Sequence, residues 1–324
     1  MSGRETLPTG YPLESSPVHV SSQAGARTGG TVAPNTGASS HPAPHAGKRA
    51  SPSRLRDIAA QLGARDLAVL ASVERYRFLT AAHLRAFHFM DHQTDASAAR
   101  TCRRVLARLR GLRVLGVLSR RIGGIRSGSE GMIYYVDAVG DRILRQQHPS
   151  RTRKRPEEPS ARFVDHTLAI ADLAVNFLQE ANTRGAEVVR LAPEHEARRR
   201  YTDFLGAPQT LKPDLYVELA EHPGDQDVEA YFVEVDLGQE SLPTLLGKCN
   251  AYEAYRRTGT EQRAYGSFPR IVWAMDATRI QTAERRRDSL RKGLDGSPSY
   301  PPGAYIIAPL HETATCLMES YGRE

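Results

Sequence analysis

The chain has 324 residues, which suits two domains and a tail, and its formal net charge of +7 favours an anionic partner without identifying one. Its three cysteines, Cys102, Cys249 and Cys316, lie far apart with no CxxC pair. This excludes a disulfide scaffold and a zinc ribbon and, since no apolar run approaches the ~20 residues of a membrane span, predicts a cytoplasmic protein.

Residues 1–53 are predicted to form a disordered tail. The first fifty are rich in Ser, Gly, Pro, Ala and Thr and contain few large apolar residues. Such a composition buries too little surface to offset the entropy lost on ordering.

Residues 54–148 are predicted to form a winged helix-turn-helix domain. Helical periodicity covers residues 65–77, Thr80 can cap a second helix, and Asp95 or Ser97 opens a third helix. Two strands, 117–121 and 132–136, follow around a Gly-rich loop, and a last helix covers 138–147. Three helices followed by a hairpin is the winged-helix order. The apolar stripe of the third helix is predicted to comprise Cys102, Val105, Leu109 and Leu112.

The third helix and the loop after it carry a run of positive charge. Residues 96–129 contain nine arginines and no acidic residue. Arginine suits bidentate contacts to phosphate or guanine, so we expect the helix to enter the major groove of duplex DNA while the loop follows phosphates. The alternative is the solvated face of a protein-interaction domain. The candidate DNA-binding residues are Arg100, Arg103, Arg104, Arg108, Arg121 and Arg126.

A basic linker at residues 149–161 precedes a predicted α/β domain at 162–310 and a C-terminal tail at 311–324. In that domain we expect a buried helix over residues 163–181, in which His166 is a hydrogen-bonded core histidine. The remaining predicted elements are strands at 187–191, 212–219 and 230–236, a helix at 242–257, a strand at 270–275, a helix at 278–292 and a strand at 304–308.

The strands at 212–219 and 230–236 are predicted to pair as a hairpin. Period-two alternation places Leu215, Val217 and Leu219 on one face, and the second strand places Glu234 and Asp236 on a common face. Pairing then brings Asp214, Glu234 and Asp236 close together, which is costly unless a cation or proton is shared. Lys248 lies in an inward-facing stripe of the next helix with Leu245, Tyr252 and Tyr255, and a carboxylate cluster would pair with it.

Pro213-Asp214 followed by Glu234-Val235-Asp236 resembles the core of the PD-(D/E)xK nucleases. The resemblance implies a restriction-endonuclease-like α/β domain in which Asp214 and Glu234 bind Mg²⁺. Asp236 stands where that family has its lysine, and Lys248 is the candidate replacement. The implied catalytic set is Asp214, Glu234, Asp236 and Lys248.

A wider pattern resembles the replication-relaxation family. It comprises residues 163–168, Lys212-Pro213-Asp214, residues 232–241, Lys248 and Tyr252, within a match covering roughly residues 64–280. The resemblance implies a protein of plasmids or other mobile elements with an N-terminal winged helix.

Together these patterns predict a protein that binds double-stranded DNA and acts in replication or DNA relaxation, either as a Mg²⁺-dependent endonuclease or nickase or without cleavage. A homodimer and contacts with replication or mobilisation proteins are compatible with this hypothesis. The alternatives are a non-enzymatic transcriptional regulator with an inactive nuclease-like scaffold, and a protein-binding adaptor. ATPase, dehydrogenase and acyl-transfer functions have no supporting motif.

Overall fold

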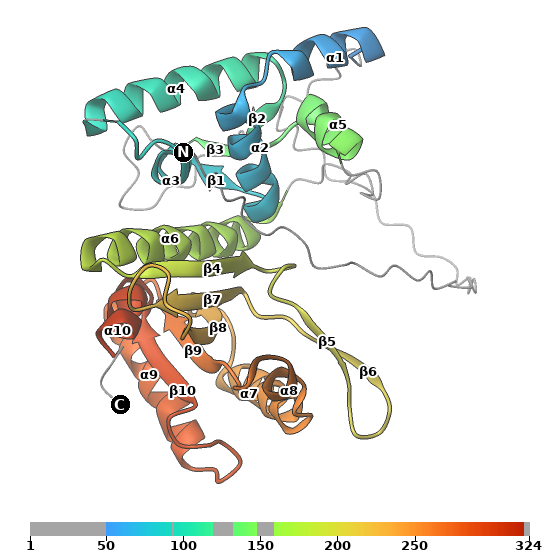
Figure 1. Ribbon diagram of the computed structural model, residues 1–324. Coiled ribbons are helices and arrows are strands. Elements are labelled where there is room, and N and C mark those ends of the chain that lie inside the picture. The colour runs from blue at the N-terminus through green and yellow to red at the C-terminus, as the bar shows by residue number, and fades with distance from the viewer. Residues whose placement is uncertain (1–49, 93, 119–131, 148–158, 321–324) are drawn as a thin grey trace, which may run out of the picture. The chain divides into compact units, whose positions relative to one another are not determined.

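The computed structural model describes residues 50–92, 94–118, 132–147 and 159–320 (Figure 1). The predicted tail up to residue 49, the loop at 119–131 and the linker at 149–158 lie outside these residues. Within the described part, no helix is long and apolar enough to cross a membrane.

The first part of the chain contains the three predicted helices and a hairpin, whose first strand lies at Leu115–Val117 rather than at the predicted 117–121, of which 119–121 lie outside the described residues. A strand of two residues, β1 (Leu79–Thr80), pairs antiparallel with β3 (Ile133–Val136), which pairs with β2 (Leu115–Val117), so the sheet order is β1-β3-β2. The helices are α1 (Pro52–Ala60), α2 (Ala64–Tyr76), α3 (Ala81–His88), α4 (Asp95–Gly111) and α5 (Ala138–Gln147).

Side-chain caps determine where α3 and α4 begin. The Thr80 hydroxyl accepts a hydrogen bond from the His83 amide, as predicted, and the Thr94 hydroxyl caps α4 by accepting one from the Ser97 amide. The predicted apolar stripe of α4 was partly wrong, because Leu106 is fully buried whereas Val105 and Leu112 are half-buried. The buried stripe is Ala98, Cys102, Leu106 and Leu109.

The second part of the chain is an α/β domain built on a five-stranded mixed sheet, which confirms the α/β class that was predicted for it. The sheet order is β10-β9-β8-β7-β4, with β4, β7 and β8 antiparallel and β8, β9 and β10 parallel. The strands are β4 (Glu187–Pro193), β7 (Leu215–Ala220), β8 (Glu229–Asp236), β9 (Arg270–Met275) and β10 (Tyr305–Pro309).

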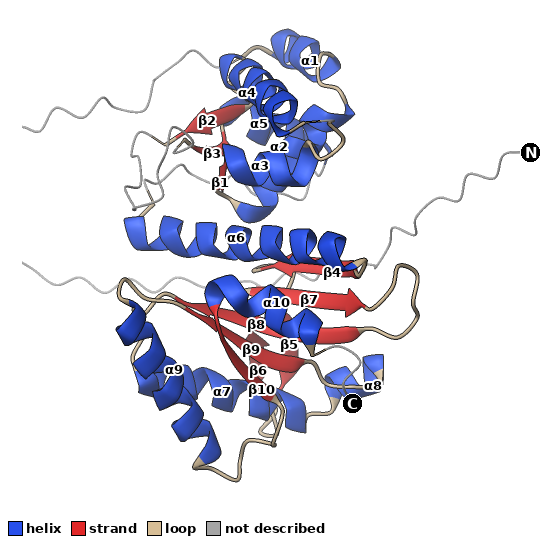
Figure 2. Ribbon diagram, turned by 90° about the vertical axis from the view of Figure 1, so that its left-hand side faces the viewer, coloured by secondary structure: helices blue, strands red, loops and turns tan. Residues whose placement is uncertain are grey.

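Helices cover both faces of this sheet (Figure 2). One face, which carries Leu215, Val217 and Val233, belongs to the same apolar cluster as α6 (Ala161–Arg184) and α10 (Thr313–Glu319). The opposite face, which carries Tyr216 and Phe232, packs on α7 (Leu242–Arg257) and α9 (Ile280–Asp295). The alternation predicted for the two strands is therefore confirmed.

Two segments of the α/β domain differ from the prediction. Strands β5 (Arg199–Thr202) and β6 (Pro208–Leu211) form a separate two-stranded hairpin that the sequence analysis missed. The predicted C-terminal tail begins instead with a 3-10 turn (Leu310–Glu312) and α10, whose Ala314 and Leu317 are buried. Helix α10 is only seven residues long, which is too short for a periodic signal. The short α8 (Thr260–Tyr265) follows α7.

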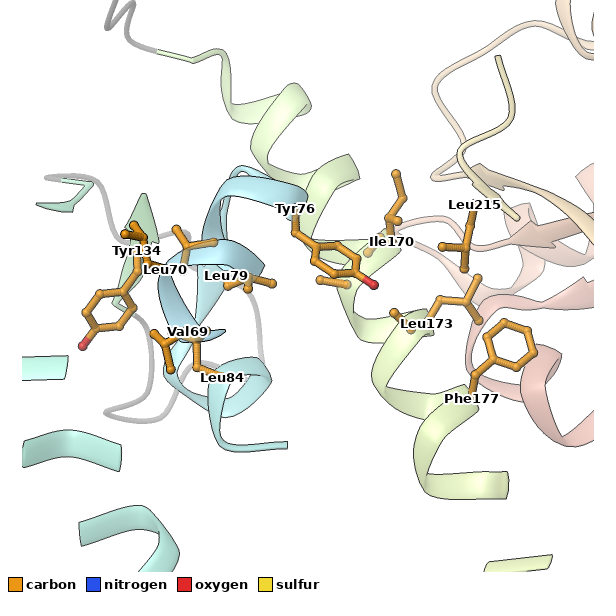
Figure 3. Packing of buried hydrophobic residues seen from close by; sticks show 14 of the residues in the cluster. Val69, Leu70, Tyr76, Leu79, Leu84, Tyr134, Ile170, Leu173, Phe177 and Leu215 are labelled. Atoms are coloured by element: carbon orange, nitrogen blue, oxygen red, sulfur yellow. The ribbon is translucent and has the colours of Figure 1, made fainter. Parts of the chain in front are cut away.

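One apolar cluster runs from the first part of the chain through α6 into the sheet (Figure 3). Leu79 and Leu84 lie in the same cluster as Ile170 and Leu173 of α6. Polar contacts span the same boundary: Arg75 binds both carboxylate oxygens of Glu196, and His83 Nε2 lies 2.7 Å from Asp172 Oδ1. Helix α6 therefore contacts both the first part of the chain and the sheet of the α/β domain.

Candidate functional site

The solvent side of α4 is a cationic surface. The arginines predicted to bind DNA, Arg100, Arg103 and Arg104, are exposed, while the opposite side of the helix is buried. Within the described part of the chain these three form no ion pair, and the Nε of Arg103 donates only to the Ala99 carbonyl, at 3.2 Å. Their positive charge is therefore not neutralised by any described carboxylate.

Arg108 differs from its neighbours on α4. Its guanidinium donates to Oδ1 of Asp66, a carboxyl group that is 5% exposed and also accepts a hydrogen bond from the Gly63 amide. This contact ties α4 to the first turn of α2, so Arg108 has a structural partner inside the domain. Arg121 and Arg126, the other two predicted DNA-binding residues, lie outside the described residues.

Asp214 lies just before β7 and faces the N-terminal part of α6. Its Oδ2 accepts a hydrogen bond from the Val235 amide at 2.8 Å, and its Oδ1 lies 3.1 Å from His166 Nε2. Burial alone would lower the pKa of His166, but the hydrogen bond to Asp214 and its negative charge outweigh burial and raise it. The predicted hydrogen bond of His166 is therefore present, with a carboxylate as its partner, but the prediction of a core position was wrong, because the side chain is 30% exposed.

Glu234 is buried between the sheet and α7. Lys248 Nζ donates to its Oε2 at 3.1 Å, and the Tyr252 hydroxyl donates to its Oε1 at 2.7 Å. Burial, followed by the negative charge of Asp214, raises the pKa of Glu234 to about 7, and Lys248 and Tyr252 oppose that rise. The predicted approach of Lys248 to this carboxylate is therefore present.

Asp236 is held by Arg286 of α9. The guanidinium donates to Asp236 Oδ2 from Nε at 2.9 Å and from Nη2 at 2.7 Å, and the same Nη2 donates to the Glu240 carbonyl at 2.6 Å. The Glu240 carboxylate in turn lies 3.0 Å from Lys248 Nζ. The sequence analysis missed Arg286, because a contact across fifty residues of sequence leaves no periodic signal, and it assigned no role to Glu240.

A pocket of about 360 Å³ opens beside these groups. The residues that line it include His166, Asp214, Asp236, Glu240, Lys248 and Arg162 of the first turn of α6. Glu234 does not line the pocket and is only 3% exposed. Of the predicted catalytic set, three side chains therefore reach this pocket and one is buried behind Lys248 and Tyr252.

In the arrangement that the structure shows, the carboxylates expected to hold Mg²⁺ already have hydrogen-bond partners within the protein. Magnesium needs oxygen ligands in near-ideal octahedral geometry. One oxygen of Glu234 accepts a hydrogen bond from Lys248 and the other accepts one from Tyr252. The Oδ2 atom of Asp236 accepts two hydrogen bonds from Arg286. Among the described residues, no three His, Cys, Asp or Glu side chains gather where they could hold a metal ion.

Comparison with protein-family models gives a match to the replication-relaxation family over residues 70–271. No curated protein and no solved structure matches the chain. The matched region includes α4, His166, the three carboxylates and Lys248. The chain belongs to the replication-relaxation family.

Proposed function

We propose that this replication-relaxation protein binds duplex DNA through the exposed side of α4 and acts in the replication or relaxation of a plasmid or other mobile element. The observation that carries this proposal is the charge of that helix. Arg100, Arg103 and Arg104 are exposed and have no carboxylate partner within the described chain. Duplex DNA offers the dense negative charge that such a surface would neutralise.

The topology around α4 supports a winged helix-turn-helix. The order α2, β1, α3, α4, β2, β3, with the sheet order β1-β3-β2, is what that fold requires. In this fold the last of the three helices enters the major groove, and here it is the arginine-bearing helix. Its apolar side packs inside the domain, so the cationic side is the one that can meet the groove.

For the α/β domain, we propose a PD-(D/E)xK-like scaffold that orients and supports the DNA-binding part rather than cleaving DNA. Its element order, α6, three antiparallel strands, α7 and β9, supports this relationship. The engagement of Glu234 by Lys248 and Tyr252, and of Asp236 by Arg286, favours a scaffold over a metal-dependent enzyme. Mg²⁺-dependent cleavage by Asp214, Glu234, Asp236 and Lys248 stays a prediction of the resemblance.

DNA binding is tested by fluorescence anisotropy with a labelled duplex over a series of salt concentrations. Replacing Arg100, Arg103 and Arg104 together by Ala should weaken binding at every salt concentration. It should also reduce the slope of log K against log salt by about one unit for each lost phosphate contact. The matched control removes three exposed cations from the α/β domain, Arg257, Arg285 and Lys292, and should leave both quantities close to wild type.

Equal losses in the two triple variants would mean that net charge alone drives binding, which contradicts a specific role for α4.

Cleavage is tested separately by incubating supercoiled DNA with the wild type and with Lys248→Ala in Mg²⁺. The scaffold proposal expects no cleavage by either protein. Cleavage by the wild type that Lys248→Ala abolishes would establish the enzyme instead.

A further inference from the structure

The β5–β6 hairpin projects from the α/β domain as an arm with a fixed base (Figure 1). At the base, Arg199 forms a buried ion pair with Glu261 of α8, and its guanidinium lies 4.6 Å from the ring centroid of Tyr216. Tyr201 packs on Tyr255 of α7 with ring centroids 4.8 Å apart. One side of the hairpin is therefore locked onto the domain, which fixes the direction of the arm.

The other side of the hairpin is exposed and positively charged. Arg200 pairs in register with Thr210 on this outer side, and both are exposed. Arg198 and Lys212, which flank the two strands, are also exposed. These three cations form no ion pair with any residue that the structure describes, and residues 198–212 contain a single acid, Asp203.

The tip of the arm presents two adjacent apolar side chains to solvent. Phe204 is 76% exposed and Leu205 is 94% exposed. The turn that carries them is ordered by Asp203, whose carboxylate accepts hydrogen bonds from the Leu205 amide at 3.0 Å, the Ala207 amide at 2.9 Å and the Gln209 side chain at 2.9 Å. The single acid of the arm is thus used to hold the turn that exposes the apolar pair.

The cationic stem and the apolar tip of the hairpin together indicate the kind of partner that it binds. An exposed apolar pair on an ordered turn marks a surface that is covered by a partner, whereas isolated exposed apolar residues need no explanation. A cationic stem with an apolar tip matches the minor groove of DNA, where phosphates line both edges and apolar wedges enter between base pairs. A second copy of the arm is a poor partner, because two stems of like charge would repel each other.

We propose that the β5–β6 hairpin is a second DNA contact, in which Arg198, Arg200 and Lys212 bind phosphates while Phe204 and Leu205 enter a base step from the minor groove and bend the duplex. This inference rests on the proposed function in one respect, since both require that the protein bind duplex DNA. It adds a distinct activity, which is deformation of the DNA, and assigns it to residues far from α4 in the sequence.

The experiment measures binding and deformation in the same sample. A duplex carrying a donor and an acceptor dye at its two ends reports bending by energy transfer, and anisotropy reports binding. The double variant Phe204→Ser/Leu205→Ser removes the apolar pair from an exposed tip, so we expect the fold to be preserved. The control is Ile280→Ser, since Ile280 is also 76% exposed but lies at the start of α9.

We expect the wild type and Ile280→Ser to raise the energy transfer on binding. The tip variant should bind with an affinity lowered by about tenfold or less and produce little or no rise at saturation. The triple variant of Arg100, Arg103 and Arg104, brought to saturation at low salt, should still bend the duplex. That pattern separates the contact of the arm from the contact of α4.

Three outcomes would overturn the inference. Equal bending by the wild type and the tip variant, with binding intact, would show that Phe204 and Leu205 do not bend the duplex. The proposed function of α4 would be unaffected. A wild type that does not bind duplex DNA removes both proposals. A wild type that is dimeric by sedimentation, with a tip variant that is monomeric, would assign the tip to self-association.

Discussion

Two charged regions of this protein differ in whether their ionic groups have partners of opposite charge within the protein. On α4, Arg100, Arg103 and Arg104 face solvent and have no carboxylate partner within the described chain. Between the sheet and helices α7 and α9, the carboxylates of Glu234 and Asp236 are each 3% exposed and each bonded to a cation. Charges of the first kind are available to an external partner, whereas those of the second kind already have an internal one.

This difference separates two roles for charge that look alike in the sequence. An exposed cation contributes little to stability and can contribute much to binding. A buried pair contributes little net stability, but its disruption leaves an uncompensated charge and is strongly destabilising. Substitutions in the two regions should therefore affect different measurements.

The largest effect on stability is expected for Arg286→Ala. The substitution leaves the Asp236 carboxylate buried without its bidentate partner, which should lower the free energy of unfolding by about 3–5 kcal/mol. Chemical denaturation measures the change. The matched control is Arg285→Ala, which removes an exposed arginine one residue earlier in α9 and should change stability by no more than about 0.5 kcal/mol. Similar losses in both variants would contradict the distinction between the regions.

The next effect concerns pH and Glu234. The folded protein retains the Glu234 proton up to a pKa of about 7, whereas the ordinary value of the carboxyl group is 4.5. The folded state therefore binds more protons between these pH values, so the free energy of unfolding should fall as pH rises through this window. His166 acts in the same direction, because its raised pKa gives stability at low pH that is lost as pH rises through the folded-state value.

Glu234→Gln should flatten this pH dependence by an amount on the order of 2 kcal/mol between pH ~5 and ~8. Denaturation curves at several pH values, compared between the wild type and the variant, provide the measurement. Parallel pH profiles would show that Glu234 ionises in the folded protein as it does in the unfolded chain.

A smaller effect tests the comparison within one helix. Arg108→Ala removes the partner of the buried Asp66 carboxyl and should cost about 1–2 kcal/mol, since the Gly63 amide remains bonded to Asp66. Arg104→Ala, one turn away and exposed, should be within about 0.5 kcal/mol of the wild type. Both are read from the same denaturation series. A reversed order would mean that the Arg108–Asp66 contact does not stabilise the domain.

The smallest expected effect is the response to Mg²⁺. Since Glu234 and Asp236 are bonded to cations of the protein, millimolar Mg²⁺ should change the melting temperature of the wild type and of Asp214→Asn equally. Differential scanning fluorimetry with Mg²⁺ or Mn²⁺ gives the comparison. A rise in the wild type that disappears in Asp214→Asn would show that these carboxylates do bind metal, and would renew the case for cleavage.

The sequence predicted those parts of the fold that depend on local chemistry. Helix α7 was predicted at its observed bounds from the helical spacing of Leu245, Lys248, Tyr252 and Tyr255. The faces of β7 and β8 followed from alternation, since a strand places neighbouring residues on opposite sides. The approach of Lys248 to Glu234 followed from combining these two periodicities.

The sequence failed where a partner is chosen by tertiary packing. The partner of Asp236 is Arg286, which the sequence analysis did not name, because α9 carries several arginines and the fold selects one of them. The β5–β6 hairpin was missed because Arg198, Arg199 and Arg200 hide its alternation. Only the fold shows that Arg199 points inward while Arg200 stays exposed.

Helix α6 also limits how such proteins can be recombined. Its Ile170 and Leu173 lie in one apolar cluster with Leu79 and Leu84 (Figure 3). Its Asp172 lies within hydrogen-bond distance of His83. A chimera that joined a foreign domain at residue 159 would leave this surface of α6 in water. Exchange of the first part of the chain between relatives therefore requires that the facing positions of α6 be exchanged with it.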